Sequence, residues 1–331
     1  MDKKELIKKS FDKIKELLSN KLFFKFFVFF LLFIALLISN MIIENNIYKS
    51  NDRSFFAITY AKIMNMPAIK INGNKVSYVD YFKFYDYLNN FYKKQNENEN
   101  NNTTINPEAI KNEVTSKLIK NSILETLSLK YNIKPTDREV FDEIKNLDYE
   151  TGSIDDTAKI IKDTYNMSLD EFKKNFIEPI IIKNKLDTII SNDPIINKDK
   201  IEKITNIYNQ IKASNNAVTK NKLGQEIDMF STLAKEFSED KTSSEEYGDL
   251  GWLSRDSMEE SIKNAAFALK DGEYSGVIKS SNGYHIIKLL DKIDTIDIPK
   301  VRIAHIFVKS MDINTYLKQE IDSAKIKIYI K

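Results

Sequence analysis

Gly283-Tyr-His-Ile-Ile-Lys-Leu289 and Val301-Arg-Ile-Ala-His-Ile-Phe-Val308 are two short apolar runs, and they contain the only two histidines of this 331-residue chain. Each run has the length and the apolar content of a buried β-strand. Scarce residue types seldom gather by chance, and His285 and His305 lie only 20 residues apart. We therefore expect the chemistry of the protein to belong to residues 237–308.

Five of the eight glycines and the single tryptophan also lie in this part of the chain. Gly248, Gly251 and Gly283 are expected to serve turns that need a positive φ. The chain has no cysteine, which excludes disulfides, cysteine nucleophiles and thiolate metal sites. Two histidines with one distant carboxylate fall short of a zinc signature, so no metal is expected. The net charge is +2, so no overall field favours nucleic acid as a partner.

The N-terminus has the pattern of a membrane signal. Phe26–Ile43 is an 18-residue stretch with only two polar interruptions, long enough with the residues before it to cross a bilayer. Eight lysines precede or enter it, against four acidic residues, which predicts a cytoplasmic N-terminus. We expect a cytoplasmic basic segment (1–21), a single-pass signal-anchor (22–43) and a linker (44–63); a cleaved signal peptide is the alternative.

The middle of the chain, residues 64–192, is expected to be mainly helical. Asn72-Gly73 between two short alternating runs predicts a β-hairpin. Ser77 then has the position of an N-cap for an aromatic-rich helix over 78–92. Gln95–Asn106 is rich in Asn and Glu, which predicts a mobile loop. The aromatic stripe fits either a client-binding surface or, as we favour, the core.

Further helices are predicted after Pro107. Thr136 with Glu139, and Ser168 with Glu171, have the spacing of capping boxes. The second of these begins a long helix in which Pro179 predicts a kink. Since this module contains no histidine, cysteine or glycine-rich phosphate loop, it is expected to bind or brace another chain rather than to catalyse.

Five motifs follow one another between residues 230 and 289: Phe-Ser-Thr-Leu-Ala-Lys-Glu-Phe-Ser-Glu-Asp (230–240), Gly-Asp-Leu-Gly-Trp (248–252), Asn-Ala-Ala-Phe-Ala-Leu (264–269), Gly-Glu-Tyr-Ser-Gly (272–276) and Gly-Tyr-His-Ile-Ile-Lys-Leu (283–289). This order resembles the parvulin (PpiC, rotamase) family of peptidyl-prolyl cis/trans isomerases. The helical module behind a membrane signal resembles, by pattern more than by motif, the chaperone segment of SurA- and PrsA-type exported foldases. The resemblance implies an α+β chain with an FKBP-like parvulin domain at 193–310 and a four-stranded antiparallel sheet.

The family's usual first strand, His-Ile-Leu-Val, has no counterpart before the helix predicted near 198–214, since 187–197 contains no histidine. A fitting strand appears later, at 301–308. In the family fold the first and last strands are antiparallel neighbours, so a short link would let 301–308 pair with 283–290 as a hairpin. We expect a circularly permuted domain, because a missing central strand would leave unpaired backbone on both neighbours. The alternative is that 301–331 is the remnant of a second parvulin domain.

The resemblance also implies the site. By motif position the polar cluster would comprise His285, His305, Asp240 and Ser280. The proline ring would be held by Leu250, Met258 and Ile262, with Phe267 packed beneath them. Ile262 departs from the Phe that is common at its position, which implies weaker or broader proline binding. Such a site needs no cofactor.

Together, the N-terminal pattern and the resemblance imply a membrane-anchored, extracytoplasmic peptidyl-prolyl isomerase that helps exported proteins fold. Its partners would be unfolded or newly translocated polypeptides with X–Pro bonds. The alternative is a non-catalytic holdase that uses both modules as client-binding platforms; a scaffold for a membrane complex is a third hypothesis. Residues 311–331 are expected to form a helix and a strand, and the alternation of Ile326, Ile328 and Ile330 would let that strand dock on the hairpin of the helical module.

Overall fold

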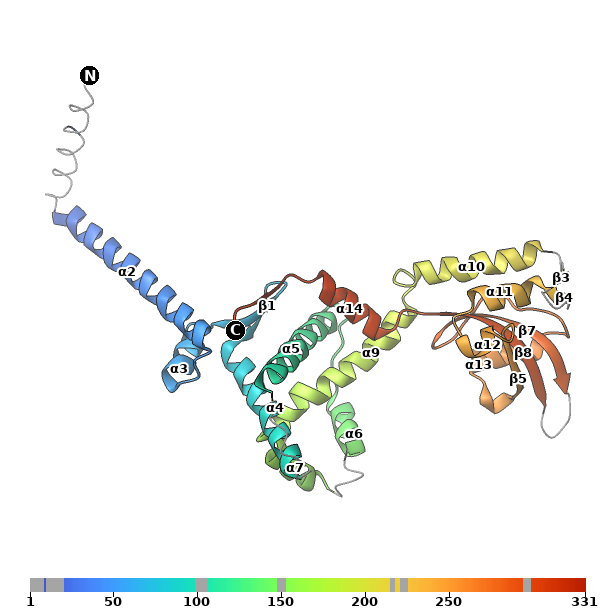
Figure 1. Cartoon of the computed structure of the whole chain (residues 1–331), viewed down its shortest axis with the longest axis horizontal. Coiled ribbons are helices and arrows are strands. Elements are labelled where there is room, and N and C mark those ends of the chain that lie inside the picture. Colours follow the sequence, from blue (N-terminus) through green and yellow to red (C-terminus); the bar gives the residue numbers. More distant parts are fainter. Residues whose placement is uncertain are drawn as a thin grey trace. The chain divides into compact units, whose positions relative to one another are not determined.

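The computed structural model describes residues 9, 21–98, 106–147, 153–214, 218–220, 226–293 and 299–331. These form two compact units (Figure 1). Unit 1 takes in Met1–Ser122, Thr164–Asn166 and Ala324–Lys331. Unit 2 takes in Ile123–Asp163 and Met167–Ser323, and it contains both histidines.

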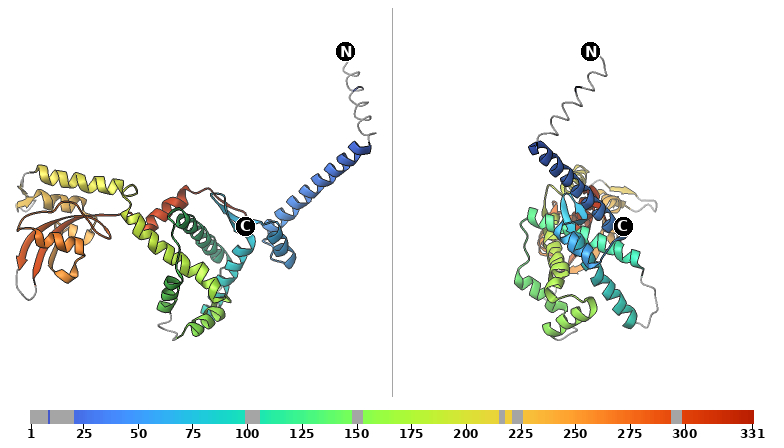
Figure 2. Two further views of the ribbon diagram at one scale, coloured as in Figure 1. Left: turned by 180° about the vertical axis from the view of Figure 1, so that it is seen from behind. Right: turned by 90° about the vertical axis from the view of Figure 1, so that its left-hand side faces the viewer.

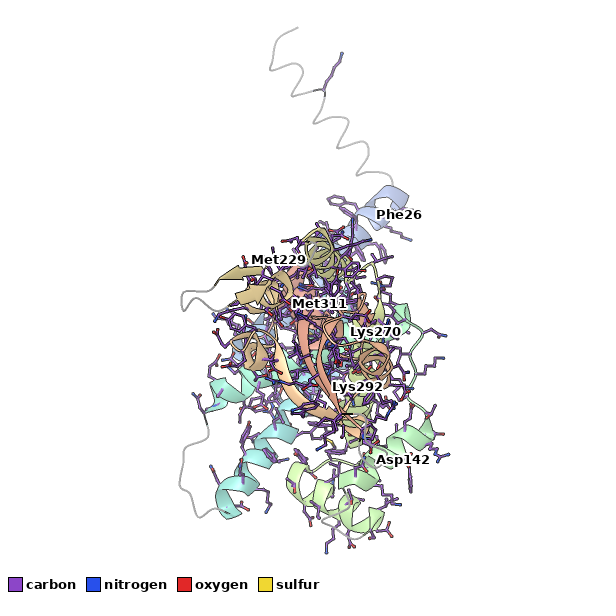
Figure 3. The ribbon with its side chains drawn as sticks, turned by 90° about the vertical axis from the view of Figure 1, so that its right-hand side faces the viewer. Phe26, Asp142, Met229, Lys270, Lys292 and Met311 are labelled. Atoms are coloured by element: carbon purple, nitrogen blue, oxygen red, sulfur yellow. The ribbon has the colours of Figure 1, made fainter. Side chains whose placement is uncertain are left out.

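The apolar N-terminal stretch forms one continuous helix, α2 (Lys21–Ser50). By length and composition, its Lys25–Ser50 part is able to cross a membrane, which fits a single-pass anchor or a signal sequence. Phe26 is 66% exposed, and Figure 3 shows its side chain projecting from the helix. Beyond the predicted span, Ile47 is only 3% exposed. The last turns of α2 therefore pack into unit 1.

Unit 1 contains a small sheet in the order β2-β1-β9. β1 (Pro67–Ile71) and β2 (Asn74–Ser77) form the predicted hairpin. Asn72 has φ 50° and Gly73 has φ 93°, as a tight hairpin turn of the I′ type requires. β9 (Ile326–Ile328) pairs antiparallel with the other edge of β1. Strands from distant parts of the sequence thus share one sheet.

Among its described residues, unit 1 also contains the helices α3 (Phe55–Ile63), α4 (Tyr78–Asn98) and the first part of α5 (Pro107–Lys130). Ser77 caps α4 as predicted, since its Oγ accepts a hydrogen bond from the Asp80 N–H at 3.0 Å. Tyr78 and Tyr81 are both 0% exposed, so the first turns of the aromatic stripe belong to the core. The prediction of a loop from Gln95 was wrong at its start, because Gln and Glu are good helix formers and α4 continues to Asn98. The rest of that predicted loop, 99–105, lies outside the described residues.

Unit 2 begins with the end of α5. Its described residues continue with α6 (Asp137–Leu147), α7 (Ile154–Tyr165, whose last two residues belong to unit 1), α8 (Leu169–Phe172), the π-helical turn η2 (Lys173–Ile177) and α9 (Glu178–Asn192). Both capping boxes are present: the backbone N–H of Glu139 donates to Thr136 Oγ1, and that of Glu171 to Ser168 Oγ. The predicted long helix is interrupted by the π-helical turn η2, which ends just before Pro179. Pro179 itself lies in the first turn of α9, where a proline is tolerated.

The rest of unit 2 surrounds a four-stranded antiparallel sheet in the order β5-β8-β7-β6. Its strands are β5 (Asp249–Ser254), β6 (Ile278–Lys279), β7 (Gly283–Ile293) and β8 (Lys300–Lys309). The other elements are α10 (Lys198–Ala213), β3 (Val218–Lys220), β4 (Glu226–Asp228), α11 (Met229–Phe237), α12 (Lys241–Ser244), the 3-10 turn η3 (Arg255–Ser257), α13 (Glu260–Ala268) and α14 (Ile313–Ser323).

Side chains alternate between the two faces of this sheet. Tyr284 and Ile286 of β7, with Ile306 of β8, pack against α10 and α11. Ile287 of β7 and Ile303 of β8 pack on the opposite face, under α13. Figures 1 and 2 show the two helical layers that enclose the strands. Because strand side chains have a period of two, the face of His285 and His305 is the face of the α13 core.

The predicted hairpin between 283–290 and 301–308 is confirmed. β7 and β8 pair antiparallel with Tyr284 opposite Val308 and Ile286 opposite Ile306. The expectation that Gly283 needs a positive φ was wrong: among the glycines that the structure describes, those with a positive φ are Gly73, Gly248, Gly251 and Gly272. Gly283 is instead a point of close approach, since a Cβ there would lie 2.4 Å from the Val308 carbonyl oxygen.

Candidate active site

The two histidines come from the adjacent central strands. In the β7–β8 register His285 lies opposite Phe307, and His305 lies opposite Ile287. The two imidazoles are therefore diagonal neighbours on one face of the sheet. Their Nδ1 atoms are 3.3 Å apart and their ring centroids 5.4 Å apart. His305 is only 8% exposed.

Asp240 reaches His305 because the segment before it is bound along β8. The Phe307 N–H donates to Ser238 Oγ at 3.1 Å, and the Glu239 N–H donates to the Phe307 carbonyl at 2.8 Å. Asp240 then caps α12, accepting from the Thr242 N–H at 3.1 Å. Its other carboxylate oxygen, Oδ2, lies 2.9 Å from His305 Nε2.

Gly248 brings the start of β5 against the same part of β8. The His305 N–H donates to the Gly248 carbonyl at 2.8 Å. Gly248 has φ 86°, and a Cβ there would lie 2.4 Å from the His305 carbonyl oxygen. Only a residue without a side chain fits both this conformation and this space, so Gly248 helps to fix the backbone of His305.

The four predicted polar residues form one hydrogen-bonded chain. Ser280 Oγ lies 2.8 Å from His285 Nε2. A carboxylate only accepts hydrogen bonds, so we assign the proton of a neutral His305 to Nε2, which donates to Asp240. The bare Nδ1 of His305 then accepts from Nδ1–H of His285, whose bare Nε2 accepts from the Ser280 hydroxyl. Every member of the chain has a partner.

Burial decides which side chains of this hydrogen-bonded cluster carry a charge. Burial, followed by the neighbouring His305, lowers the pKa of His285 to about 4. Burial also lowers the pKa of His305, although Asp240 opposes this effect. For Asp240, burial alone would raise the pKa, but hydrogen bonds from Ser243, Thr242 and His305 outweigh it and hold the pKa well below its usual value. At neutral pH the site therefore contains two neutral imidazoles beside one carboxylate.

We expect His285 to titrate near pH 4 in the folded chain, below its ordinary value of 6.5. Between these two values the unfolded state binds more protons than the folded state, so stability should fall as the pH falls below 6.5. NMR of the protein labelled at its histidines measures the pKa of His285 directly, because only two imidazoles contribute signals. A His285 that titrates at its ordinary value would contradict the burial of the pair.

The predicted apolar residues gather on the same face of the sheet as the histidines. They are partly buried and pack against the core cluster of Ala266, Ile287, Leu289, Val301 and Ile303. The four residues are Leu250, Met258, Ile262 and Phe267. The Arg255 guanidinium lies 4.0 Å from the centre of the Phe267 ring, which covers that ring on one side. The structure thus places a polar chain and an apolar surface on one side of a rigid sheet.

Two residues that contact the histidines were missed from the sequence. The Phe307 ring lies 4.7 Å from the His285 ring and stacks on His305 at 6.1 Å. Ser243 Oγ lies 3.1 Å from His305 Nε2 and 2.6 Å from Asp240 Oδ2. Strand alternation after His305 would have found Phe307, and the N-cap spacing after Asp240 would have found Ser243.

Within the described parts of the chain, histidine and carboxylate side chains form no group of three or more around a common point. The cluster around His285 and His305 has one carboxylate, Asp240, and two hydroxyls. Its donors are already paired with one another. What this arrangement offers a substrate is two neutral, oriented imidazoles and one carboxylate beside an apolar surface.

Two family models match the chain over most of its length. Residues 13–185 match the SurA-like N-terminal domain. Residues 195–291 match the PPIC-type PPIase domain of the rotamase family. The second match ends before β8, so it includes His285, Asp240 and Ser280 but not His305.

Similar proteins cover only part of this chain. The "Foldase protein PrsA" of Geobacillus kaustophilus is 29% identical over 208 residues, which are 59% of this chain and 70% of the relative. "Foldase protein PrsA 2" of Bacillus cereus is 32% identical over 177 residues, 51% of this chain and 57% of the relative. A crystal structure of the peptidylprolyl isomerase PrsA from Bacillus anthracis is 21% identical, with a TM-score of 0.21, covering 62% of this chain and 86% of that one.

Proposed function

We propose that this chain, which belongs to the family of the SurA-like N-terminal domain and carries a PPIC-type peptidyl-prolyl isomerase domain, is a foldase that speeds X–Pro cis/trans exchange in exported proteins. Its partners would be unfolded or newly translocated polypeptides. The reaction would need no cofactor, since it makes and breaks no covalent bond.

One observation carries the proposal. The hydrogen-bonded chain from Ser280 through His285 and His305 to Asp240 lies on the same sheet face as the apolar residues around Ile262. A proline ring is apolar, whereas its amide is polar, so an isomerase site must offer both kinds of surface side by side.

The geometry suits rotation of an amide. Loss of resonance makes the barrier to rotation about 18–20 kcal/mol, and uncatalysed exchange takes about 10–100 s. Leu250, Met258 and Ile262 would hold the proline ring while the rest of the substrate turns. The twisted amide nitrogen becomes pyramidal, and the preorganised dipoles of the neutral histidine chain would stabilise that state more than the planar one.

We further propose that β8 is the first strand of the parvulin fold, displaced to the C-terminal side of the domain. β8 lies between β5 and β7 in the middle of the sheet. Its sequence His305-Ile-Phe-Val308 resembles the family's His-Ile-Leu-Val. A remnant of a second domain would not need to complete this sheet, so the shared pairing with β7 favours permutation.

We propose the remaining segment boundaries from the position of the apolar helix and of the isomerase domain. Residues 1–21 would be cytoplasmic, 22–43 the signal-anchor and 44–63 a linker, with the bulk of the chain outside the cytoplasm. The helical chaperone-like module would occupy 64–192 and the isomerase 193–310. The excess of lysines before the apolar stretch supports this orientation, and the length of α2 supports a single crossing.

The test is cis/trans exchange of an Ala-Pro peptide, followed by NMR with the full chain in detergent micelles. We expect the exchange rate to rise with enzyme concentration and to fall to the uncatalysed value with His305→Ala. A folded chain that leaves the exchange rate unchanged would refute the isomerase.

A non-catalytic holdase is the second candidate, and Ile262 favours it, because the resemblance leads one to expect an aromatic residue there. Aggregation of an unfolded client that contains no proline separates the two. An isomerase whose action requires X–Pro bonds should give little protection, whereas a holdase should keep its full effect on such a client.

A further inference from the structure

The helix that follows α2 exposes an apolar face. α3 buries Ala57 and Ala61, which are 0% and 2% exposed, one turn apart. Three of its large apolar side chains lie outside that contact: Phe55 is 88% exposed, Phe56 63% and Ile63 75%. Because positions 56 and 63 are two helical turns apart, these side chains follow one face of the helix. A contiguous exposed apolar face usually marks an interaction site.

The charge of α3 favours a partner with an apolar layer and phosphate groups. Its sequence, Phe-Phe-Ala-Ile-Thr-Tyr-Ala-Lys-Ile, has one charged residue, Lys62, and no carboxylate. Lys62 is exposed, next to Ile63. Such a lysine can extend its ammonium group to lipid phosphates while its neighbours enter the apolar layer.

A hydrogen bond places α3 beside the apolar helix. The Tyr60 hydroxyl donates to Asn40 Oδ1 at 3.1 Å. Asn40 belongs to α2 and lies three residues before Ile43, the end of the apolar stretch. At about 1.5 Å per residue, Asn40 is about 5 Å inside that end. Figures 1 and 2 show α3 beside the C-terminal end of α2.

The ring contacts place the exposed face of α3 at the same depth along α2 as Asn40. Phe56 stacks on Tyr60 with ring centroids 6.1 Å apart. Both rings therefore lie near the height of Asn40, where lipid headgroups meet acyl chains if α2 crosses the membrane. On the far side of this level, Ile47 is already packed in the folded body of unit 1.

We propose that α3 lies in the outer interface of the lipid bilayer, with Phe55, Phe56 and Ile63 inserted among the acyl chains. Unit 1 is then held against the membrane by two elements, the crossing helix α2 and the interfacial helix α3. This inference rests on the proposed membrane anchorage of α2. It differs from a linker over 44–63, because it gives part of that segment a bound structure of its own.

The test uses the full chain in vesicles of phosphatidylethanolamine and phosphatidylglycerol. The chain has no cysteine, so Phe56→Cys and Ile63→Cys each accept a single nitroxide label. Leu36→Cys, 60% exposed on α2, is the control for a lipid-facing site. Lys75→Cys, exposed on β2, is the control for a water-facing site. Electron paramagnetic resonance then compares collisions with oxygen, which enters the bilayer, and with a water-soluble nickel chelate.

We expect the labels at 56 and 63 to collide with oxygen and to be shielded from nickel, at a depth of about 5–10 Å. Nickel access equal to that of Lys75→Cys, with Leu36→Cys still embedded, overturns the inference and leaves the anchorage intact. Shielding from both reagents overturns it too, because protein then covers the face. In that case, dipolar broadening of the nitroxide spectrum that disappears when labelled protein is diluted with unlabelled protein would identify a second copy of this chain as the covering partner. Nickel access at Leu36→Cys overturns the anchorage itself.

Discussion

A chain that ends at Ile293, before β8, is expected to lose the fold of its isomerase domain and all of its catalysis. Val301, Ile303, Ile306 and Val308 are each 0% exposed. Burying each such side chain contributes about 1.5–3 kcal/mol, so their sum rivals the about 5–15 kcal/mol that stabilises a whole domain. Both neighbouring strands would also lose their backbone partners. NMR of the labelled histidine would detect the loss of the fold, because the signal of His285 would move to the position of an unfolded chain.

The matched control is a chain that ends at Ser310, which keeps β8 and removes α14 and β9. It should keep the His285–His305 contact and its exchange activity. Adding a peptide of residues 299–310 to the shorter chain should restore part of the activity, because β8 pairs through its own backbone. A shorter chain that stays folded and active without the peptide would refute the displaced first strand.

Asp240→Asn is expected to lower the rate of catalysed exchange about a hundredfold, a typical cost of losing a group that orients a catalytic histidine. The amide keeps the size of the carboxylate but can donate to His305 Nε2, which favours the opposite tautomer and reverses the hydrogen-bonded chain to His285. The loss of charge should lower the pKa of His305 further, since Asp240 now opposes the effect of burial. Peptide exchange and histidine titration measure the two effects on one sample.

Asp249→Asn is the matched control, because it removes a carboxylate nearby without touching the histidines. Asp249 pairs with Arg302 at 2.5 Å and accepts from the Gly251 N–H. An ion pair this near the surface contributes about 0–1 kcal/mol, so exchange should stay close to that of the unaltered chain. Equal activity of the two variants would remove Asp240 from the proposed site.

Several elements were predictable because their signals are local. The Asn72-Gly73 turn and the capping boxes at Thr136 and Ser168 depend on donors and acceptors within four residues of one another. The run from Phe26 needs only its composition to form an apolar helix. The prediction failed at Gln95, where a polar, low-complexity composition was interpreted as a loop although its residue types also favour helix.

The sequence by itself determined which residues are rare and which runs form strands. The grouping of His285 and His305 near Asp240 was implied only by the resemblance to the parvulin family. The sequence did not determine the register. The structure sets His285 opposite Phe307 rather than His305, so that the imidazoles meet on a diagonal. A shift of one residue would turn a histidine to the other face. That choice depends on packing between residues far apart in the chain, which no local preference encodes.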